Sequence, residues 1–212
     1  MRMYSVDFLD KLVLLAQEYS VKVIFDEIMT GWGRTGRMFA MDYCSQKPDI
    51  VCLSKGLTGG VLPLGLTVAT NEIYNAFLSE DKTKALLHGH SFTGNALACA
   101  AACASIDLFE TDVTTQKIKQ LCEWNASFLV ELKKVPSILE VRNLGTILAI
   151  EINTGEGNSY FSSIRDKAYD FFLERGVLLR PLGNVIFINP PYCITEEEYS
   201  HVKNAILAFL KI

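Results

Sequence analysis

Three short apolar runs, each followed by a polar or glycine-rich segment, constrain the fold of this chain more than any other feature. The runs are VKVIFDE (21–27), DIVCLSK (49–55) and LTVAT (66–70), and all contain β-branched residues. Continuous apolar runs of this length are typical of strands that are buried on both faces of a sheet. Helical periodicity covers residues 5–19 and resumes near Asn71. This alternation of helices and strands predicts an α/β fold with a mostly parallel sheet.

A long helix and then a different pattern follow these strands. Residues 95–110 (NALACAAACASIDLFE) have high helix propensity and a face of small side chains. Beyond Thr111, helices and strands are mixed, which indicates a small α+β domain. The elements expected there are a helix over 115–134, strands over 138–145 and 146–152, a polar loop over 153–160, a helix over 162–175, strands over 176–181 and 185–191, and a last helix capped by Thr195 and Glu198. We therefore predict two domains, residues 1–111 and 112–212.

Composition argues against several classes of function. The net charge is −4 and no block of Lys or Arg is present, so a nucleic-acid partner is not expected. No apolar run reaches the roughly 18 residues that a membrane-spanning helix needs, and the first residues lack the apolar core of a signal peptide. The six cysteines form no CxxC pair and no spaced set with His88, His90 or His201. This pattern predicts reduced thiols in a cytoplasmic protein without a metal site.

Two reactive groups stand at the ends of the first two predicted strands. Asp26 ends the first run and Lys55 ends the second. In open parallel sheets ligands bind beyond the carboxyl ends of the strands, so we expect both side chains to face one cavity. A desolvated lysine amine forms Schiff bases with aldehydes, and an acid can keep a pyridine nitrogen protonated, as pyridoxal-phosphate enzymes require. From the spacing alone, a simple salt bridge between Lys55 and Asp26 also accounts for the pattern.

The segments around these residues resemble the signature of class-III aminotransferases, which are fold-type I enzymes dependent on pyridoxal phosphate. The similarity is carried by VIFDEIMTGWGRTGRMFA (23–40) and PDIVCLSKGLTGGVLPLG (48–65), and it extends through essentially the whole chain. The resemblance implies that Asp26 holds the pyridine nitrogen and that Lys55 binds the cofactor as a Schiff base. It also implies that the first predicted domain is the C-terminal part of the cofactor-binding large domain and the second is the small C-terminal domain.

A third segment, HGHSFTGNALACAAACASI (88–106), is similar to the family's loop that reaches the cofactor phosphate of a neighbouring subunit. The resemblance implies a homodimer in which the Ser91 hydroxyl binds the phosphate, with His90 beside it and Gly89 close to the substrate. A serine just before a helix start suits an anion site. A plain helix cap would place a serine there as well.

Within the class, MRMY (1–4), the loop LTGGVLPLG and the segment LLRPLGNVIFINPPY are most similar to members that act in biotin synthesis. That resemblance implies transfer of an amino group from S-adenosylmethionine, or from lysine in some relatives, to 8-amino-7-oxononanoate, which gives 7,8-diaminononanoate. Arg180 matches an arginine that binds the substrate carboxylate, and Arg34 matches an arginine near the active site. A local ion pair of Arg180, or bracing of its own loop by Arg34, is the structural alternative. Trp32 stands where phenylalanine is common in relatives and is expected to serve packing.

We expect that the family's first half, which supplies a phosphate-binding loop and an aromatic residue stacked on the cofactor ring, is missing from this chain. Strand edges that should be covered would then be bare, and a complementing N-terminal half would be needed. Two other interpretations stay open. The chain could be part of another class-III ω-amino-acid aminotransferase, or it could be a non-catalytic dimerisation module or remnant of such an enzyme.

Overall fold

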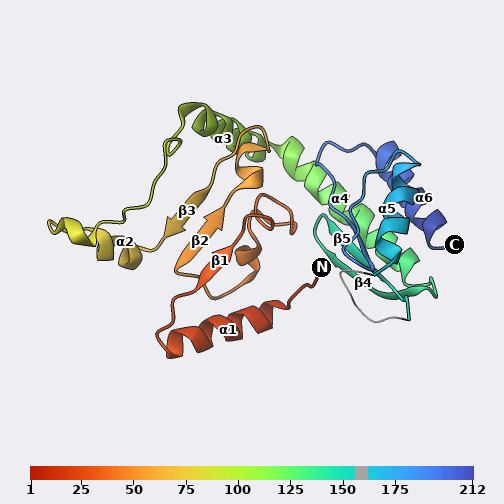
Figure 1. Cartoon of the computed structure of the whole chain (residues 1–212), viewed down its shortest axis with the longest axis horizontal. Coiled ribbons are helices and arrows are strands. Elements are labelled where there is room, and N and C mark those ends of the chain that lie inside the picture. Colours follow the sequence, from red (N-terminus) through yellow and green to blue (C-terminus); the bar gives the residue numbers. More distant parts are fainter. Residues whose placement is uncertain (156–161) are drawn as a thin grey trace. The chain divides into compact units, whose positions relative to one another are not determined.

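The computed structural model describes residues 1–155 and 162–212 and divides them into two compact units (Figure 1). The N-terminal unit comprises residues 4–114, and the C-terminal unit comprises residues 115–212 with residues 1–3. The polar loop expected over 153–160 lies partly outside the described residues. Of the helices in the described part of the chain, none has both the length and the hydropathy needed to cross a membrane.

The N-terminal unit begins with helix α1 (Val6–Glu18), whose N-cap is Ser5. The three predicted apolar runs then form short strands, namely β1 (Ile24–Asp26), β2 (Ile50–Leu53) and β3 (Leu66–Ala69). Between them lie two short 3-10 turns, η1 (Ala40–Tyr43) and η2 (Lys55–Thr58). The strands are shorter than the runs because residues at the ends of each run, such as Val23, Glu27 and Lys55, already belong to the connections.

The sheet of this unit is mixed, and the prediction of a mostly parallel sheet is wrong for β3. The strand order is β1-β2-β3, in which β1 and β2 are parallel whereas β2 and β3 are antiparallel. A parallel return needs a crossover of a dozen or more residues, usually with a helix. The connection from β2 to β3 contains only the turn η2, so the chain comes back antiparallel.

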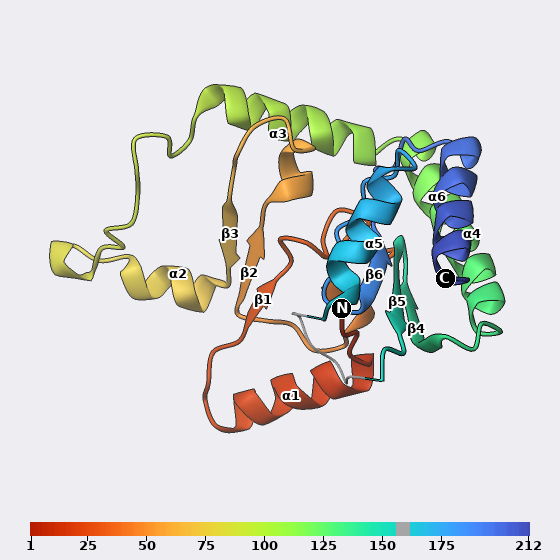
Figure 2. The same ribbon diagram turned by 45° about the vertical axis from the view of Figure 1, so that its right-hand side comes forward.

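One face of this sheet packs against helix α3 (Ala96–Phe109). Val51 and Leu53 of β2 are buried in one cluster with Ala102 of this helix, whereas Cys52 between them is only half-buried. Helix α3 runs close beside η2, as Figures 1 and 2 show. Its small side chains allow this approach. The buried face of β2 is therefore the face toward α3, and Cys52 points to the other face.

The chain between β3 and α3 forms an extended arm that runs apart from the sheet (Figures 1 and 2). The arm contains helix α2 (Asn71–Phe77) and the turn η3 (Lys82–Lys84). Every residue from 74 to 94 is exposed, and Leu87 retains 93% of its accessible surface. Apolar side chains on such an arm are typical of a segment that another surface covers.

The C-terminal unit packs helices against an antiparallel sheet of order β4-β5-β6. The helices are α4 (Asp112–Leu132), α5 (Ile164–Leu173) and α6 (Glu196–Phe209), and the strands are β4 (Ile138–Leu144), β5 (Ile147–Ile152) and β6 (Val185–Ile188). The central strand β5 is buried at every residue, and Phe128 of α4 and Phe172 of α5 belong to the same core. The predicted capping box of Thr195 and Glu198 at the start of α6 is confirmed.

The strand predicted over 176–181 is wrong. This segment has no regular strand pairing, and only Leu182, just beyond it, makes an isolated bridge with Val185. The sheet of this unit has the order β4-β5-β6, and residues 176–181 join neither of its outer strands. Alternating side chains still pack inward, since Val177 is buried while Leu178 is exposed. The short apolar run over 177–179 therefore contributes Val177 to the core without forming a strand.

Candidate active site

Asp26 and Lys55 leave the sheet at the same edge. Asp26 is the last residue of β1 and is paired with Cys52 of the parallel strand β2, and Lys55 follows shortly after β2 ends. The Asp26 carboxylate shares the Cys52 face, which is the face away from α3. Both Asp26 and Lys55 are exposed, and Asp26 Oδ1 accepts a hydrogen bond from the Ile28 N–H at 3.0 Å. The pair therefore stands where open sheets bind ligands.

Lys55 has an unusual backbone conformation. Its φ angle is 46°, in the left-handed region that residues other than glycine rarely adopt. Two hydrogen bonds brace the turn around it: the Ser54 hydroxyl donates to the Leu64 carbonyl at 2.7 Å, and the Gly60 N–H donates to the Lys55 carbonyl at 3.2 Å. The direction in which the Lys55 side chain leaves the sheet is thus set by a fixed turn.

Glu27, next to Asp26, is a buried carboxylate that the sequence analysis did not single out. Only 2% of its surface is accessible. Its Oε1 accepts the Met41 N–H at 2.7 Å, and its Oε2 accepts the Ala40 N–H at 3.1 Å and the Thr30 hydroxyl. These bonds tie the far end of the glycine-rich loop back to the end of β1. The sequence feature that could have identified Glu27 is the second acidic residue of FDE (25–27).

The glycine-rich loop over 28–39 holds one arginine and one tryptophan of interest. Arg34 is half-buried within the loop. Trp32 is buried, has a φ of 59°, and packs against Phe39 and Phe109 with ring centroids 5.5 Å and 5.7 Å apart. Trp32 therefore belongs to the core between this loop and α3, which agrees with the packing role that its position indicated.

Gly89, His90 and Ser91 lie in the exposed arm. The His90 N–H donates to Thr93 Oγ1 at 3.0 Å, and His90 Nδ1 accepts the Phe92 N–H at 3.1 Å. These bonds form a local turn on the arm rather than a contact with the Lys55 turn. The structure therefore brings Asp26 and Lys55 to one edge of the sheet, and it leaves the three arm residues in an exposed turn.

The expectation that Ser91 lies just before a helix start is wrong. Helix α3 begins at Ala96, and the Asn95 side chain is its cap, accepting the N–H groups of Leu97 and Ala98 at 3.1 Å each. Asn95 provides this cap because its amide oxygen reaches the second and third N–H groups of the helix. Ser91 is a turn residue in front of this cap.

Arg180 belongs to the C-terminal unit, in the irregular segment after α5, and is exposed. A different arginine of this unit makes a close ion pair: Arg142 Nη1 lies 2.7 Å from Glu151 Oε2, and both side chains are largely buried. That pair joins the neighbouring strands β4 and β5. Burial and pairing identify Arg142 as a structural arginine, while the Arg180 side chain is exposed.

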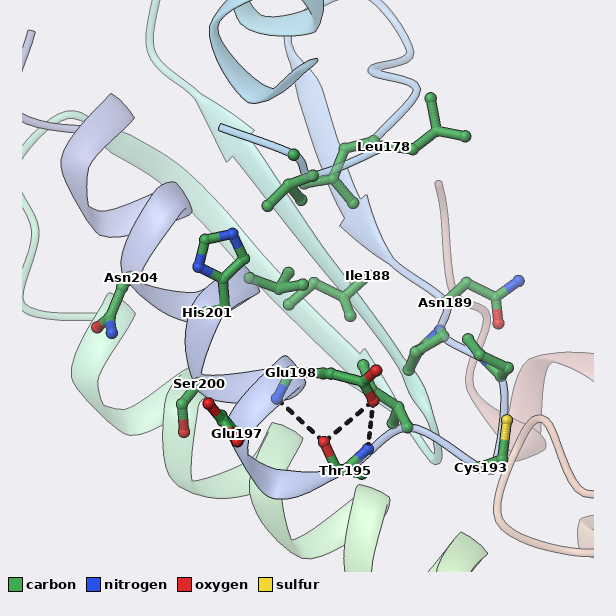
Figure 3. Close-up of a pocket in the computed structure, with 17 residues that line it drawn as sticks. Leu178, Ile188, Asn189, Cys193, Thr195, Glu197, Glu198, Ser200, His201 and Asn204 are labelled. Carbon is green, nitrogen blue, oxygen red and sulfur yellow. Dashed lines mark hydrogen bonds between the residues drawn. The ribbon is translucent and has the colours of Figure 1, made fainter. Parts of the chain in front are cut away.

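A cavity of about 950 Å³ opens in the C-terminal unit (Figure 3). The segment after α5, the end of β6 and the first half of α6 line it, including Leu178, Ile188 and His201. His201 Nε2 lies 2.8 Å from the Arg175 carbonyl, which connects α6 to the end of α5. All the residues that line the cavity belong to the C-terminal unit, whereas Lys55 and Asp26 belong to the N-terminal unit.

A third carboxylate aligns the strands that carry the pair. Asp49 Oδ2 accepts the Val23 N–H at 2.8 Å, and Lys22 Nζ lies 3.3 Å from Asp49 Oδ1. The bond from Val23, and to a lesser degree Lys22, lowers the pKa of Asp49 below its ordinary 3.8.

Among the described residues, no three His, Cys, Asp or Glu side chains gather as metal ligands would. The site thus offers an amine and a carboxylate on aligned strands.

Comparisons with known proteins identify relatives along the whole chain. The family model for aminotransferase class-III matches residues 1–210. An adenosylmethionine-8-amino-7-oxononanoate aminotransferase from Helicobacter pylori is 42% identical, over 100% of this chain and 48% of that protein. The enzyme of the same name from Methanocaldococcus jannaschii is 38% identical over 98% of this chain and 47% of its own length.

Solved structures agree with these matches. The crystal structure of the Methanocaldococcus jannaschii protein superimposes with a TM-score of 0.88 at 38% identity, covering 96% of this chain and 49% of that one. The ornithine aminotransferase from Toxoplasma gondii gives a TM-score of 0.80 at 28% identity, covering 96% of this chain and 46% of that one. The chain spans about half the length of the curated relatives it matches. Because the family model spans nearly all of its residues, the chain belongs to the class-III aminotransferase family.

Proposed function

We propose that this chain supplies Lys55 and Asp26 to a pyridoxal-phosphate-dependent aminotransferase of biotin synthesis. The observation that carries the proposal is the position of both residues at the carboxyl ends of neighbouring parallel strands. The reaction would move an amino group from S-adenosylmethionine to 8-amino-7-oxononanoate and give 7,8-diaminononanoate. The name that the two curated relatives share supports this choice of substrates.

The residues present fit the cofactor. An exposed lysine amine and an exposed carboxylate at one sheet edge match the aldehyde and the pyridine nitrogen of pyridoxal phosphate. When bound, the cofactor supplies a protonated ring that withdraws electrons from the substrate's reacting carbon. The Asp26 carboxylate would keep the proton on the ring nitrogen. The Lys55 amine would hold the cofactor, and after release by the amino donor it would move the proton at that carbon.

Other residues would complete the site in the assembled enzyme. We assign the cofactor phosphate to the Ser91 hydroxyl, with His90 beside it, and we place Gly89 close to the substrate. Their exposed arm suits a contact with a second subunit, so a homodimer is part of the proposal. Arg180 would bind the carboxylate of 8-amino-7-oxononanoate bidentately, and Arg34 would lie near the substrate.

A complementing N-terminal half is also part of the proposal, on the same polypeptide or on a separate one. The match to only about half of each relative supports it. The test is an amino-transfer assay of this chain mixed with the unmatched half of the Helicobacter pylori relative. We expect 7,8-diaminononanoate to form with S-adenosylmethionine as donor. Absence of product with every amino donor would leave the chain as a non-catalytic module of the family.

The alternative within the class is another ω-amino-acid aminotransferase. An (S)-enantioselective omega-transaminase from Thermomicrobium roseum has a TM-score of 0.85 at 27% identity, so the fold serves more than one substrate. The same assay with several keto acids separates the alternatives. Faster amino transfer to another keto acid than to 8-amino-7-oxononanoate would favour the alternative.

A further inference from the structure

The left-handed backbone at Lys55 needs neighbours that hold it, because such a conformation is unfavourable for a lysine. The next residue is Gly56, and its surroundings leave no room for a side chain. A Cβ built on Gly56 would lie 2.7 Å from Trp32 Cβ and 2.8 Å from Trp32 Cγ. Side-chain atoms do not approach so closely, so the Gly56 backbone lies directly against the Trp32 side chain.

The other contact of Gly56 comes from α3. The Ser105 hydroxyl donates a hydrogen bond to the Gly56 carbonyl at 2.9 Å. Ser105 is buried on the alanine-rich face of this helix, where an alanine would pack as well. A buried hydroxyl in the middle of a helix is stable when it is hydrogen-bonded, and here its partner lies outside the helix. The Gly56 carbonyl also accepts the Gly59 N–H at 3.1 Å within the turn.

We infer that Ser105 is a positioning residue for the Lys55 amine. Its hydrogen bond to the Gly56 carbonyl, with Trp32 as the packing surface, holds the Gly56–Leu57 peptide in one orientation. The turn that begins at Lys55 is thereby anchored to α3, which limits the backbone conformations open to the lysine that carries the amine. Sequence separation hides this function, because Ser105 and Gly56 are 49 residues apart. The inference rests on the proposed function, since it gives the aimed amine a cofactor to bind.

The experiment compares Ser105→Ala with Ser105→Thr, which keeps the hydroxyl, and with Ser45→Ala as the matched control. Ser45→Ala also removes a hydroxyl hydrogen bond in the N-terminal unit, the 2.8 Å bond to Asp10. Each full-length variant is incubated with pyridoxal phosphate and reduced with borohydride. Peptide mass spectrometry then gives the ratio of cofactor on Lys55 to cofactor on Lys82, which is exposed in the arm.

We expect Ser105→Ala to lower this ratio about fivefold, the scale of one hydrogen bond, while Ser105→Thr and Ser45→Ala keep the wild-type ratio. A general loss of packing would accelerate amide exchange throughout the N-terminal unit, whereas loss of the Ser105 bond alone would accelerate it only at the turn that begins at Lys55. If Ser105→Ala keeps the wild-type ratio in a protein whose wild type prefers Lys55, the inference is overturned, whatever happens to the thermal midpoint.

Amide hydrogen exchange supplies a measurement that does not depend on the cofactor. The N–H groups of Gly59 and Gly60 donate to the carbonyls of Gly56 and Lys55. They should exchange at least about fivefold faster in Ser105→Ala. If wild-type protein shows no preference for Lys55 over Lys82, the proposed function fails, and exchange alone decides the inference. Faster exchange of the Gly59 and Gly60 N–H groups then supports the inference that Ser105 stabilises the turn, and unchanged exchange overturns it.

Discussion

Glu27, at the end of β1, is a buried carboxylate whose oxygens are all hydrogen-bonded within the protein. Its buried carboxylate accepts the N–H groups of Ala40 and Met41 and the Thr30 hydroxyl. Removing one buried partner leaves the others without a hydrogen bond, which costs more than the bond itself contributes. The Glu27 carboxylate therefore joins the end of β1 to both ends of the glycine-rich loop.

Glu27→Ala should lower the free energy of unfolding by about 2 to 4 kcal/mol, because backbone donors lose their acceptor inside the protein. Urea unfolding followed by circular dichroism measures this change. Glu80→Ala, at an exposed position of the arm, is the control and should stay within about 0.5 kcal/mol of wild type. Equal stability of the two variants would show that the Glu27 contacts contribute nothing.

Gly56→Ala should destabilise the protein by about 1 to 3 kcal/mol, because the added methyl group overlaps Trp32. Gly65→Ala is the matched control, since a Cβ at Gly65 meets nothing within 4 Å. The thermal midpoints of both variants can be compared in one experiment. A midpoint for Gly56→Ala as high as that of Gly65→Ala would contradict the close contact of Gly56 with Trp32.

Sequence reasoning located Asp26 and Lys55 at the ends of strands because strand ends follow from local patterns. It overlooked Glu27 and Ser105 because their partners are distant in sequence. Glu27 bonds Met41, 14 residues away, and Ser105 bonds Gly56, 49 residues away. Contacts of this kind become visible only when the loop and the helix are placed against the sheet.

At the scale of elements, the register of β1 and β2 depends on the junction that precedes β2. Asp49 accepts the Val23 N–H, and this bond lowers the pKa of Asp49 below 3.8 in the folded protein. A carboxyl group with a lowered pKa stabilises the folded state above its unfolded pKa, and the stabilisation is lost as pH falls through the folded value. Acid should therefore loosen this junction.

Asp49→Asn should reduce the acid sensitivity of the protein. Wild-type stability should fall as the pH is lowered from about 6 to about 3, and the variant should lose less over the same range because the asparagine amide does not titrate. Thermal midpoints at several pH values test this expectation. Asp7→Asn, at an exposed position of α1, serves as the control. Parallel curves for wild type and Asp49→Asn would contradict it.

Most elements could be predicted from sequence, and the exceptions have physical causes. Helix α6 follows from its Thr195 cap, and α3 follows from its alanine-rich run. The antiparallel direction of β3 depends on the shape of the turn at Lys55–Thr58, which an apolar run does not encode. The segment over 176–181 has a short apolar run, as strands do, but in the structure it buries Val177 without pairing to the sheet.

At the scale of the whole molecule, the N-terminal unit carries features that suit a larger assembly. Strands β1 and β3 are both edges of its sheet, and Ile24 of β1 is 59% exposed. Unpaired strand edges bind other strands readily. The chain spans about half of its curated relatives, so the proposed complementing half has the length to cover such an edge. In the proposed homodimer, the exposed arm would contact the second subunit.

The central claim is that Lys55 is the residue that carries the cofactor, and visible absorbance tests it most directly. Purified chain, with or without the complementing half, is incubated with pyridoxal phosphate, and the absorbance band of lysine-bound cofactor is recorded for wild type, Lys55→Ala and Lys82→Ala. We predict that Lys55→Ala abolishes the band, because the amine that binds the aldehyde is gone. Lys82→Ala, in the exposed arm, should retain it. A Lys55→Ala protein that keeps the wild-type band would contradict the account.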